Sequence, residues 1–269
     1  MKTVSLNSGS NGNCFYIESN GIRIIVEAGL TGKQYESRLS KIDIHPSQID
    51  AVLVSHEHCD HIAGAGVISR KYGTPIYMTE KTAAVLPQRI GEIRDLRTYL
   101  AGQSFQVGSL VVQTVPAKHD CAGGVHYVIT DGEFRLGVIT DAGQPHNILH
   151  SMISTLDVLF LESNYDPKLL NECHYPQSLK TRIMGGYGHL SNLQAAQMVR
   201  NYASQRLKHL ILCHISDQAN TFSLVNEIHR KIHQGDYKMS LAPRDDIGEF
   251  IDLLQDHKYI ATINNNNDL

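Results

Sequence analysis

Residues 56–61 read His-Glu-His-Cys-Asp-His and bring three imidazoles and a carboxylate into one short segment. Imidazole nitrogens and carboxylate oxygens are ligands that zinc favours, and manganese and iron also accept them. The segment follows an apolar run, 51–55, that predicts a buried strand, and it precedes 62–72, which predicts a helix. Because sites in open α/β sheets lie where strands end and helices begin, this segment is predicted to be a metal-binding loop.

Three more residues of ligand type, His119, Asp141 and His214, each follow another predicted strand. The ends of different strands can converge on one rim of a sheet sandwich, so we expect these residues to join the loop. The combined donor set contains five imidazoles and two carboxylates: His56, His58, Asp60, His61, His119, Asp141 and His214.

This donor set suits two divalent ions, Zn²⁺ or Mn²⁺, with iron as a further option. Alternation along an extended loop puts His56 and His58 on one side. The expected division is His56, His58 and His119 for the first ion, and Asp60, His61 and His214 for the second. Asp141 is expected to bridge them. Two ions about 3.5–4 Å apart can hold and activate a hydroxide that attacks an ester, so the site predicts metal-dependent hydrolysis.

The elements that must position these residues are short strands and amphipathic helices. Asn20-Gly21 and Asp131-Gly132 are the clearest hairpin turns. Strands are predicted over 4–6, 14–18, 22–26, 51–55, 75–78, 104–107, 110–115, 125–130, 134–140, 157–162 and 207–213. Helices are predicted over 62–72, 80–86, 177–184, 192–204 and 223–233. This order favours two β-rich layers with helices outside them. No linker interrupts it, so a single domain over 1–260 and a flexible tail over 261–269 are predicted.

The composition limits the functional classes. A net charge of -3 argues against a globally basic nucleic-acid binder but leaves room for a local phosphate site. The five cysteines are scattered and odd in number, and the N-terminal residues carry no apolar signal-peptide core, so we expect a reduced, cytoplasmic protein. No apolar run approaches the roughly 20 residues of a membrane span. The sequence predicts no oligomeric state.

The ordered motifs, Glu27, the loop 56–61, His119, Asp141 and His214, resemble those of the metallo-β-lactamase superfamily over about residues 1–250. Within it the chain is similar to the YycJ (WalJ) group of nucleases, through the segments 8–14, 161–164, 175–180 and 188–192. The resemblance implies an αββα four-layer sandwich of the α/β class, a dinuclear centre, and cleavage of phosphodiester bonds. For this group it implies 5′-to-3′ exonuclease action on DNA.

The resemblance also implies roles for single residues. Asp60 and His189 would be catalytic, with His189 contacting the scissile phosphate or protonating the leaving oxygen. Glu27 stands where relatives usually carry Asp and would orient a ligand histidine. Tyr165 occupies a position often filled by His. The candidate substrate-binding residues are Ser10, Asn11, Asn13 and Asn192.

Other interpretations stay open at this point. His189 also suits the entry to a helix capped by Ser191 or Asn192, and the Gly9–Asn13 loop could simply turn. A hydrolase of a cyclic phosphodiester, lactone or thioester is the alternative function. A di-iron oxygen or nitric oxide reductase is disfavoured because His58 stands where such proteins carry a carboxylate. A nucleic acid is the expected partner, with DNA favoured over RNA.

Overall fold

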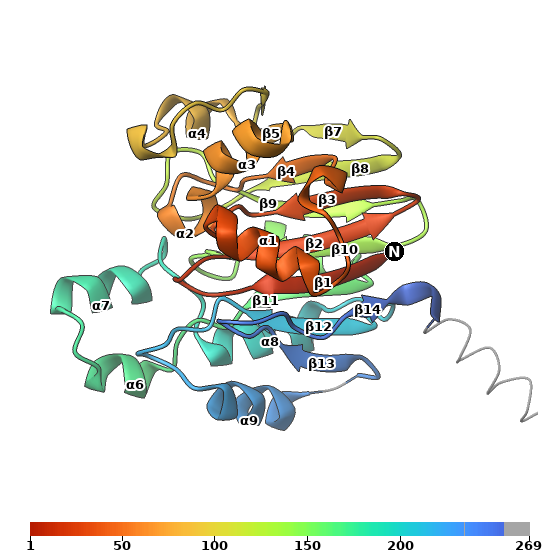
Figure 1. Cartoon of the computed structure of the whole chain (residues 1–269). Helices are drawn as coiled ribbons and strands as arrows, with labels where there is room; N and C mark the ends of the chain where they lie inside the picture. Colours follow the sequence, from red (N-terminus) through yellow and green to blue (C-terminus); the bar gives the residue numbers. More distant parts are fainter. Residues whose placement is uncertain (234, 256–269) are drawn as a thin grey trace, which may run out of the picture.

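Two β-sheets stack face to face in the computed structural model, which describes residues 1–233 and 235–255. Helices cover the outer face of each sheet, so the described part has four layers in the order αββα (Figure 1). The predicted sandwich is therefore confirmed. The predicted tail, 261–269, lies outside the described residues.

The first sheet has the strand order β14-β1-β2-β3-β4-β5-β6. Its strands are β1 (Lys2–Asn7), β2 (Cys14–Ser19), β3 (Ile22–Val26), β4 (Ala51–Leu53), β5 (Ile76–Thr79), β6 (Leu96–Tyr99) and β14 (Ile251–Asp252). Strands β1 to β3 are antiparallel, and β3 to β6 are parallel. The β2–β3 hairpin turns at Asn20-Gly21, where both residues have positive φ, as the sequence predicts.

The second sheet has the order β13-β12-β11-β10-β9-β8-β7. Its strands are β7 (Ser104–Val107), β8 (Leu110–Pro116), β9 (Val125–Thr130), β10 (Arg135–Ile139), β11 (Val158–Glu162), β12 (His209–Cys213) and β13 (Lys238–Leu241). Strands β10 to β13 run parallel, so their carboxyl ends share one edge of the sheet. That common edge can gather side chains that are far apart in the sequence.

The central core lies between the two sheets. Phe15 of the first sheet and Phe160 of the second meet there with ring centroids 4.9 Å apart, and neither has exposed surface. Burying such a side chain contributes about 1.5–3 kcal/mol. Tyr127 also crosses the core: its hydroxyl donates to the carbonyl of Val54 at 2.8 Å. This contact connects the second sheet to the segment that leads into the 56–61 loop.

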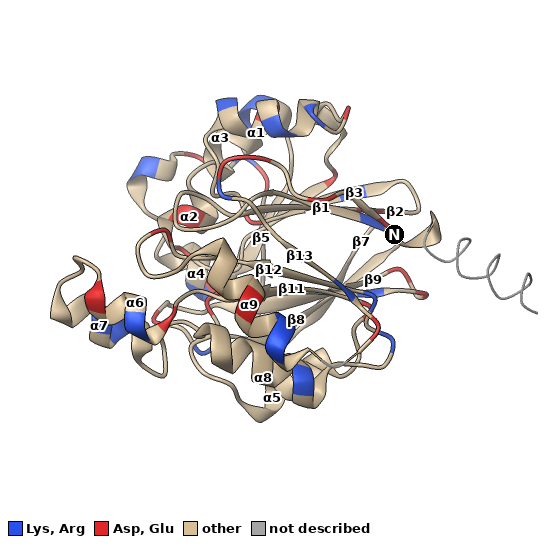
Figure 2. Cartoon of the chain, turned by 90° about the horizontal axis from the view of Figure 1, so that it is seen from below, with Lys and Arg blue, Asp and Glu red and all other residues tan. Residues whose placement is uncertain are grey.

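The helices pack on the outer faces and along the edges. The α-helices are α1 (Gly32–Ser40), α2 (Cys59–Ile62), α3 (Ala65–Tyr72), α4 (Glu80–Ala84), α5 (Asn147–Ile153), α6 (Pro167–Glu172), α7 (Gln177–Met184), α8 (Asn192–Tyr202) and α9 (Phe222–Ile232). Two short 3-10 helices are η1 (Pro46–Gln48) and η2 (Gln88–Ile90). Figure 2 shows basic and acidic residues interspersed over the outer helices. Within the described ranges, no helix is long and apolar enough to cross a membrane.

The predicted helix over 62–72 is wrong in its start. The metal-binding loop itself forms the single turn α2, and a second helix, α3, begins only at Ala65. Gly64 separates them because it packs on the backbone of the loop that follows β3: its N–H donates to the Ala28 carbonyl at 2.7 Å, and a Cβ there would stand 2.2 Å from the Leu30 carbonyl oxygen. Tertiary packing therefore divides a segment that looks continuous in the sequence.

Candidate metal centre

All seven predicted donors lie at one edge of the sandwich, on loops or on the short helix α2. The loop after β4 carries the donors of 56–61, and the connection from β8 to β9 carries His119. Asp141 and His214 come just after β10 and β12, which are both neighbours of β11. The expectation that strand ends bring these residues together agrees with their positions.

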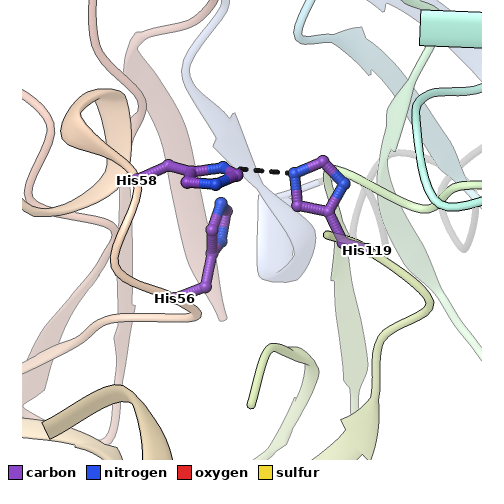
Figure 3. Close-up of side chains that lie close together, drawn as sticks. All are labelled: His56, His58 and His119. Carbon is purple, nitrogen blue, oxygen red and sulfur yellow. Dashed lines mark hydrogen bonds between the residues drawn. The ribbon is translucent and has the colours of Figure 1, made fainter. Parts of the chain in front are cut away.

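The first donor group contains His56, His58 and His119, whose ring nitrogens lie within 4.8 Å of one another. Their imidazoles point toward one another from two separate loops (Figure 3), and Nδ1 of His58 lies 3.2 Å from Nε2 of His119. His58 is the N-cap of α2 but makes no side-chain capping bond, so its ring remains available.

The rings of His56 and His119 are each oriented by a contact of the Nδ1 nitrogen. The Nδ1 of His56 pairs with the Ser55 hydroxyl at 2.8 Å, and the Nδ1 of His119 lies 3.1 Å from the Gly188 carbonyl oxygen. The Nε2 of His56 is buried and has no hydrogen-bond partner in the described structure. A buried nitrogen without a partner is costly unless it binds a cation, so this donor group fits a metal ion.

The second donor group contains Asp60, His61 and His214, again within 4.8 Å. Oδ2 of Asp60 lies 3.4 Å from Nε2 of His61 and 3.3 Å from Nε2 of His214. Behind them, Glu27 places Oε2 3.3 Å from Nδ1 of His61, the position expected of a residue that orients this ring. Glu27 also accepts the Ser55 N–H at 3.2 Å, which ties the two donor groups together.

Asp141 lies between the two groups. Its Oδ2 is 2.8 Å from Nε2 of His61, and its Oδ1 is 3.6 Å from Nε2 of His119 and 3.7 Å from Nδ1 of His214. The side chain is almost fully buried, with 5% exposure. A carboxylate that reaches both imidazole groups is the geometry that a bridging ligand requires.

The backbone at the centre adopts unusual conformations. Glu27, Asp141 and His214 have φ values of 70°, 52° and 52°, in the left-handed region that residues with a side chain rarely enter. Each such conformation costs about 1–3 kcal/mol and persists only where the surrounding structure holds the residue in place. The fold therefore uses conformational energy to direct these three side chains into the centre.

Glu162 is a site residue that the sequence analysis did not single out. It ends β11, is fully buried, and places Oε2 3.4 Å from Nδ1 of His189 and 3.6 Å from Nδ1 of His214. It also accepts the backbone N–H groups of Asp141 and, at 2.5 Å, Leu190. The signal was available, because Glu162 follows a buried apolar run as Asp141 and His214 do.

Nδ1 of His189 lies 3.2 Å from Oδ1 of Asp141, in addition to its contact with Glu162. Its side chain is 16% exposed. Ser191 two residues later is the N-cap of α8, as one sequence interpretation held, but the His189 ring joins the donor cluster rather than the helix.

Burial and neighbouring charges shift the pKa values of several residues in the cluster. Burial alone would raise the pKa of Glu162, but the neighbouring His189 and His214 rings outweigh it and lower the pKa to about 2. Burial likewise opposes ionisation of Asp141, yet the attraction of His214 and His61 holds its pKa well below the ordinary value. Burial, with repulsion from His61, lowers the pKa of His56. The centre therefore offers ionised carboxylates and, at His56, a neutral imidazole.

The candidate substrate-binding residues occupy different environments. Ser10 is exposed and lines a cavity of about 370 Å³ over the donors. Asn11 is exposed too, but its amide donates to the Arg244 carbonyl at 2.8 Å and to Asp245 at 2.9 Å. Asn13 is buried, with its amide 3.2 Å from Nε2 of His61.

Asn192 is fully buried behind the centre. Its Oδ1 accepts from the Ser163 hydroxyl at 2.8 Å, and its amide donates to Asn220 at 2.9 Å. Tyr165 turns into a separate small core with Leu170 and Ile183 instead of entering the donor cluster.

Comparison with known proteins agrees with this arrangement. Residues 23–215 match the model of a family described as the beta-lactamase superfamily domain. The chain is 33% identical over 213 residues to exodeoxyribonuclease YycJ of Bacillus anthracis, covering 78% of this chain and 81% of the relative. It is 32% identical over 225 residues to exodeoxyribonuclease WalJ of Streptococcus pneumoniae, covering 82% and 84%.

Among solved structures, Zn²⁺-bound PqqB from Methylobacterium extorquens superimposes with a TM-score of 0.72 at 15% identity, covering 94% of this chain and 100% of that one. At this identity the likeness concerns the fold alone. The matched family model and the two relatives of similar length together carry the assignment: the chain belongs to the metallo-β-lactamase superfamily, in the family of the exodeoxyribonucleases YycJ and WalJ.

Proposed function

We propose that this chain is a metal-dependent exodeoxyribonuclease that releases nucleotides from the 5′ end of DNA. The observation that carries the proposal is the position of Asp141 between two donor groups, with His189 beside it and an open cavity above. The names of the two relatives, both exodeoxyribonucleases, support DNA as the substrate.

His56, His58 and His119 would hold one divalent ion, and Asp60, His61 and His214 the other, with Asp141 shared between them. The nitrogen and oxygen donors suit Zn²⁺ or Mn²⁺, and iron is compatible. Ions bound there would lower the pKa of a water toward neutrality and balance negative charge on the attacking and leaving oxygens.

The chain's own residues would then orient the reacting groups. The Asp60 carboxylate is 21% exposed, the most open carboxylate of the donor set, so it can orient a water as well as a cation. Glu162 and Asp141 engage Nδ1 of His189, which leaves its Nε2 without a partner among the described residues. That nitrogen is available to contact the scissile phosphate and to protonate the leaving oxygen.

The buried side chains of Asn13 and Asn192 position other residues of the site. Asn13 steadies His61 and Asp60, while Asn192 joins α8 to the strand end that carries Glu162. Ser10 lines the cavity, where it can meet the strand backbone, and the neighbouring Asn11 anchors this loop to Arg244 and Asp245. All five cysteines are free thiols, which supports the reducing, cytoplasmic compartment.

The test is time-resolved cleavage of end-labelled duplex DNA, single-stranded DNA and RNA by protein loaded with manganese or zinc, beside a His214→Ala control. Stepwise release of nucleotides from a 5′-phosphorylated DNA end, lost in the control, is the expected result. If wild-type protein leaves all three polymers intact, the proposal fails and the substrate is to be sought among small phosphodiesters.

A further inference from the structure

The cavity over the donors has two chemically different walls. One side is formed by the metal-site residues, among them His58, Asp60 and His189. The facing side is contributed by the α6–α7 arm, residues 166–186, through Tyr175, Leu179, Arg182 and Ile183. Figures 1 and 2 both show α6 and α7 projecting from the edge of the sandwich at which α2 lies. The arm therefore borders the reaction site without belonging to either sheet.

The arm is held in a defined position. Ile183 and Leu170 pack with Tyr165 into a small apolar core of their own. Lys180 ties α7 to α6 by donating to the Asn171 carbonyl at 2.6 Å. The arm is joined to the loop after β12 because the Asp166 N–H donates to the Ala219 carbonyl at 2.9 Å. These contacts fix the distance between the arm and the metal centre.

Arg182 is the positively charged residue that the arm contributes to the cavity. Two of its nitrogens, Nε and Nη2, donate to the carboxylate of Asp120, the residue after His119. Nη1 has no partner in the part of the chain that the structure describes. Asp120 thus fixes the guanidinium beside the centre while one amino group stays available, and guanidinium groups are well suited to bind phosphate.

We propose that the α6–α7 arm is the subsite for the 5′-terminal nucleotide. Arg182 binds its 5′ phosphate, and Tyr175 and Leu179 pack against its base. The next phosphate then lies on the metal centre. The cavity of about 370 Å³ falls within the range of small-ligand sites, about 300–1,000 Å³, so it has room for one nucleotide.

This inference rests on the proposed exonuclease activity and gives that activity its end specificity. A strand with a free 5′ end can enter the subsite, whereas a closed circular strand would have to pass the arm. The enzyme is therefore expected to prefer linear DNA over circular single-stranded DNA, and 5′-phosphorylated ends over 5′-hydroxyl ends.

The experiment compares wild type, Arg182→Gln and Arg182→Lys with Arg89→Gln, a matched loss of an exposed arginine on η2, outside the cavity. A hydrogen bond to a charged group contributes about 10- to 100-fold in affinity. Arg182→Gln should raise KM for the 5′-phosphorylated strand by about that factor and abolish the preference over the 5′-hydroxyl strand. Arg182→Lys should be intermediate, because it keeps the charge, and Arg89→Gln should match wild type.

Two further measurements separate binding from a structural effect on His119, which Asp120 also approaches, at 3.3 Å. Metal content should stay at the wild-type value in Arg182→Gln. In the His214→Ala background, adding Arg182→Gln should weaken binding of a fluorescent 5′-phosphorylated strand by the same factor. The slope of log K against the logarithm of salt concentration should become smaller in magnitude by about one unit.

Each outcome is decisive. If wild type degrades linear DNA but Arg182→Gln keeps its 5′-phosphate preference, the subsite is refuted and the exonuclease proposal stands. If closed circles are cleaved as fast as linear strands, cleavage does not start from an end, and both proposals fail. If wild type degrades no DNA, both fail.

Discussion

Replacing Glu162 by Gln should reduce both stability and turnover. The carboxylate accepts the N–H groups of Asp141 and Leu190 on different oxygens and also faces Nδ1 of His189. Gln has nearly the same shape but has one donor in place of an acceptor. Whichever way its amide turns, its NH₂ group therefore meets a buried N–H.

The magnitude follows from these contacts. A buried N–H left without an acceptor costs about 1–3 kcal/mol, and Gln leaves one of the two in that state, so we expect a loss of about 2 kcal/mol in the free energy of unfolding. A correctly placed acid–base group contributes about 10²- to 10⁴-fold, so misorienting His189 should lower kcat by about 100-fold.

Urea unfolding and single-turnover cleavage, both at measured metal content, provide the assay. Glu133→Gln is the matched control, because Glu133 is exposed and its carboxylate has no partner among the described residues; surface changes of this kind stay within about 0.5 kcal/mol. A Glu162→Gln protein with unchanged stability, wild-type metal content and a kcat lowered by less than about threefold would refute the reasoning.

Three other expectations follow from the same structure. His56→Ala should lose one of two bound metals, seen by elemental analysis, because Nε2 of His56 is a buried donor without a protein partner; retention of both ions would contradict this. Chelation of the metals should lower Tm, because the carboxylates of the centre then face one another without cations; calorimetry with and without chelator tests this, and an unchanged Tm argues against tight binding. Burial lowers the pKa of His229 to about 4 from its ordinary 6.5. The unfolded chain then takes up a proton that the native state excludes, so stability should fall below pH 6.5 by about 1.4 kcal/mol per unit, or about 2 kcal/mol between pH 7 and 5. His229→Gln should show a pH dependence smaller by that amount in urea titrations, and equal slopes would refute the assignment.

Several features of the fold could be read from local patterns alone. The hairpin at Asn20-Gly21 and the strand that ends before Asp141 were predictable because turn chemistry and apolar runs act over a few residues. The edge strands β6, β13 and β14 were not predicted. In β6 three of four residues are exposed, so pairing with a neighbour, rather than an apolar pattern, makes it a strand.

The sequence by itself determined the donor inventory and most of the strands that carry it. His56 and His58 had to lie close together because a single residue separates them along one loop. Only the tertiary structure decided how this loop meets His119 and His214, because their approach depends on the register and order of parallel strands in two packed sheets. It alone added Glu162, whose role comes from neighbours far away in the chain, and it alone set the α6–α7 arm beside the centre. Spacing along the chain specifies chemistry over a few residues, whereas contacts between strand ends require the whole sandwich to form.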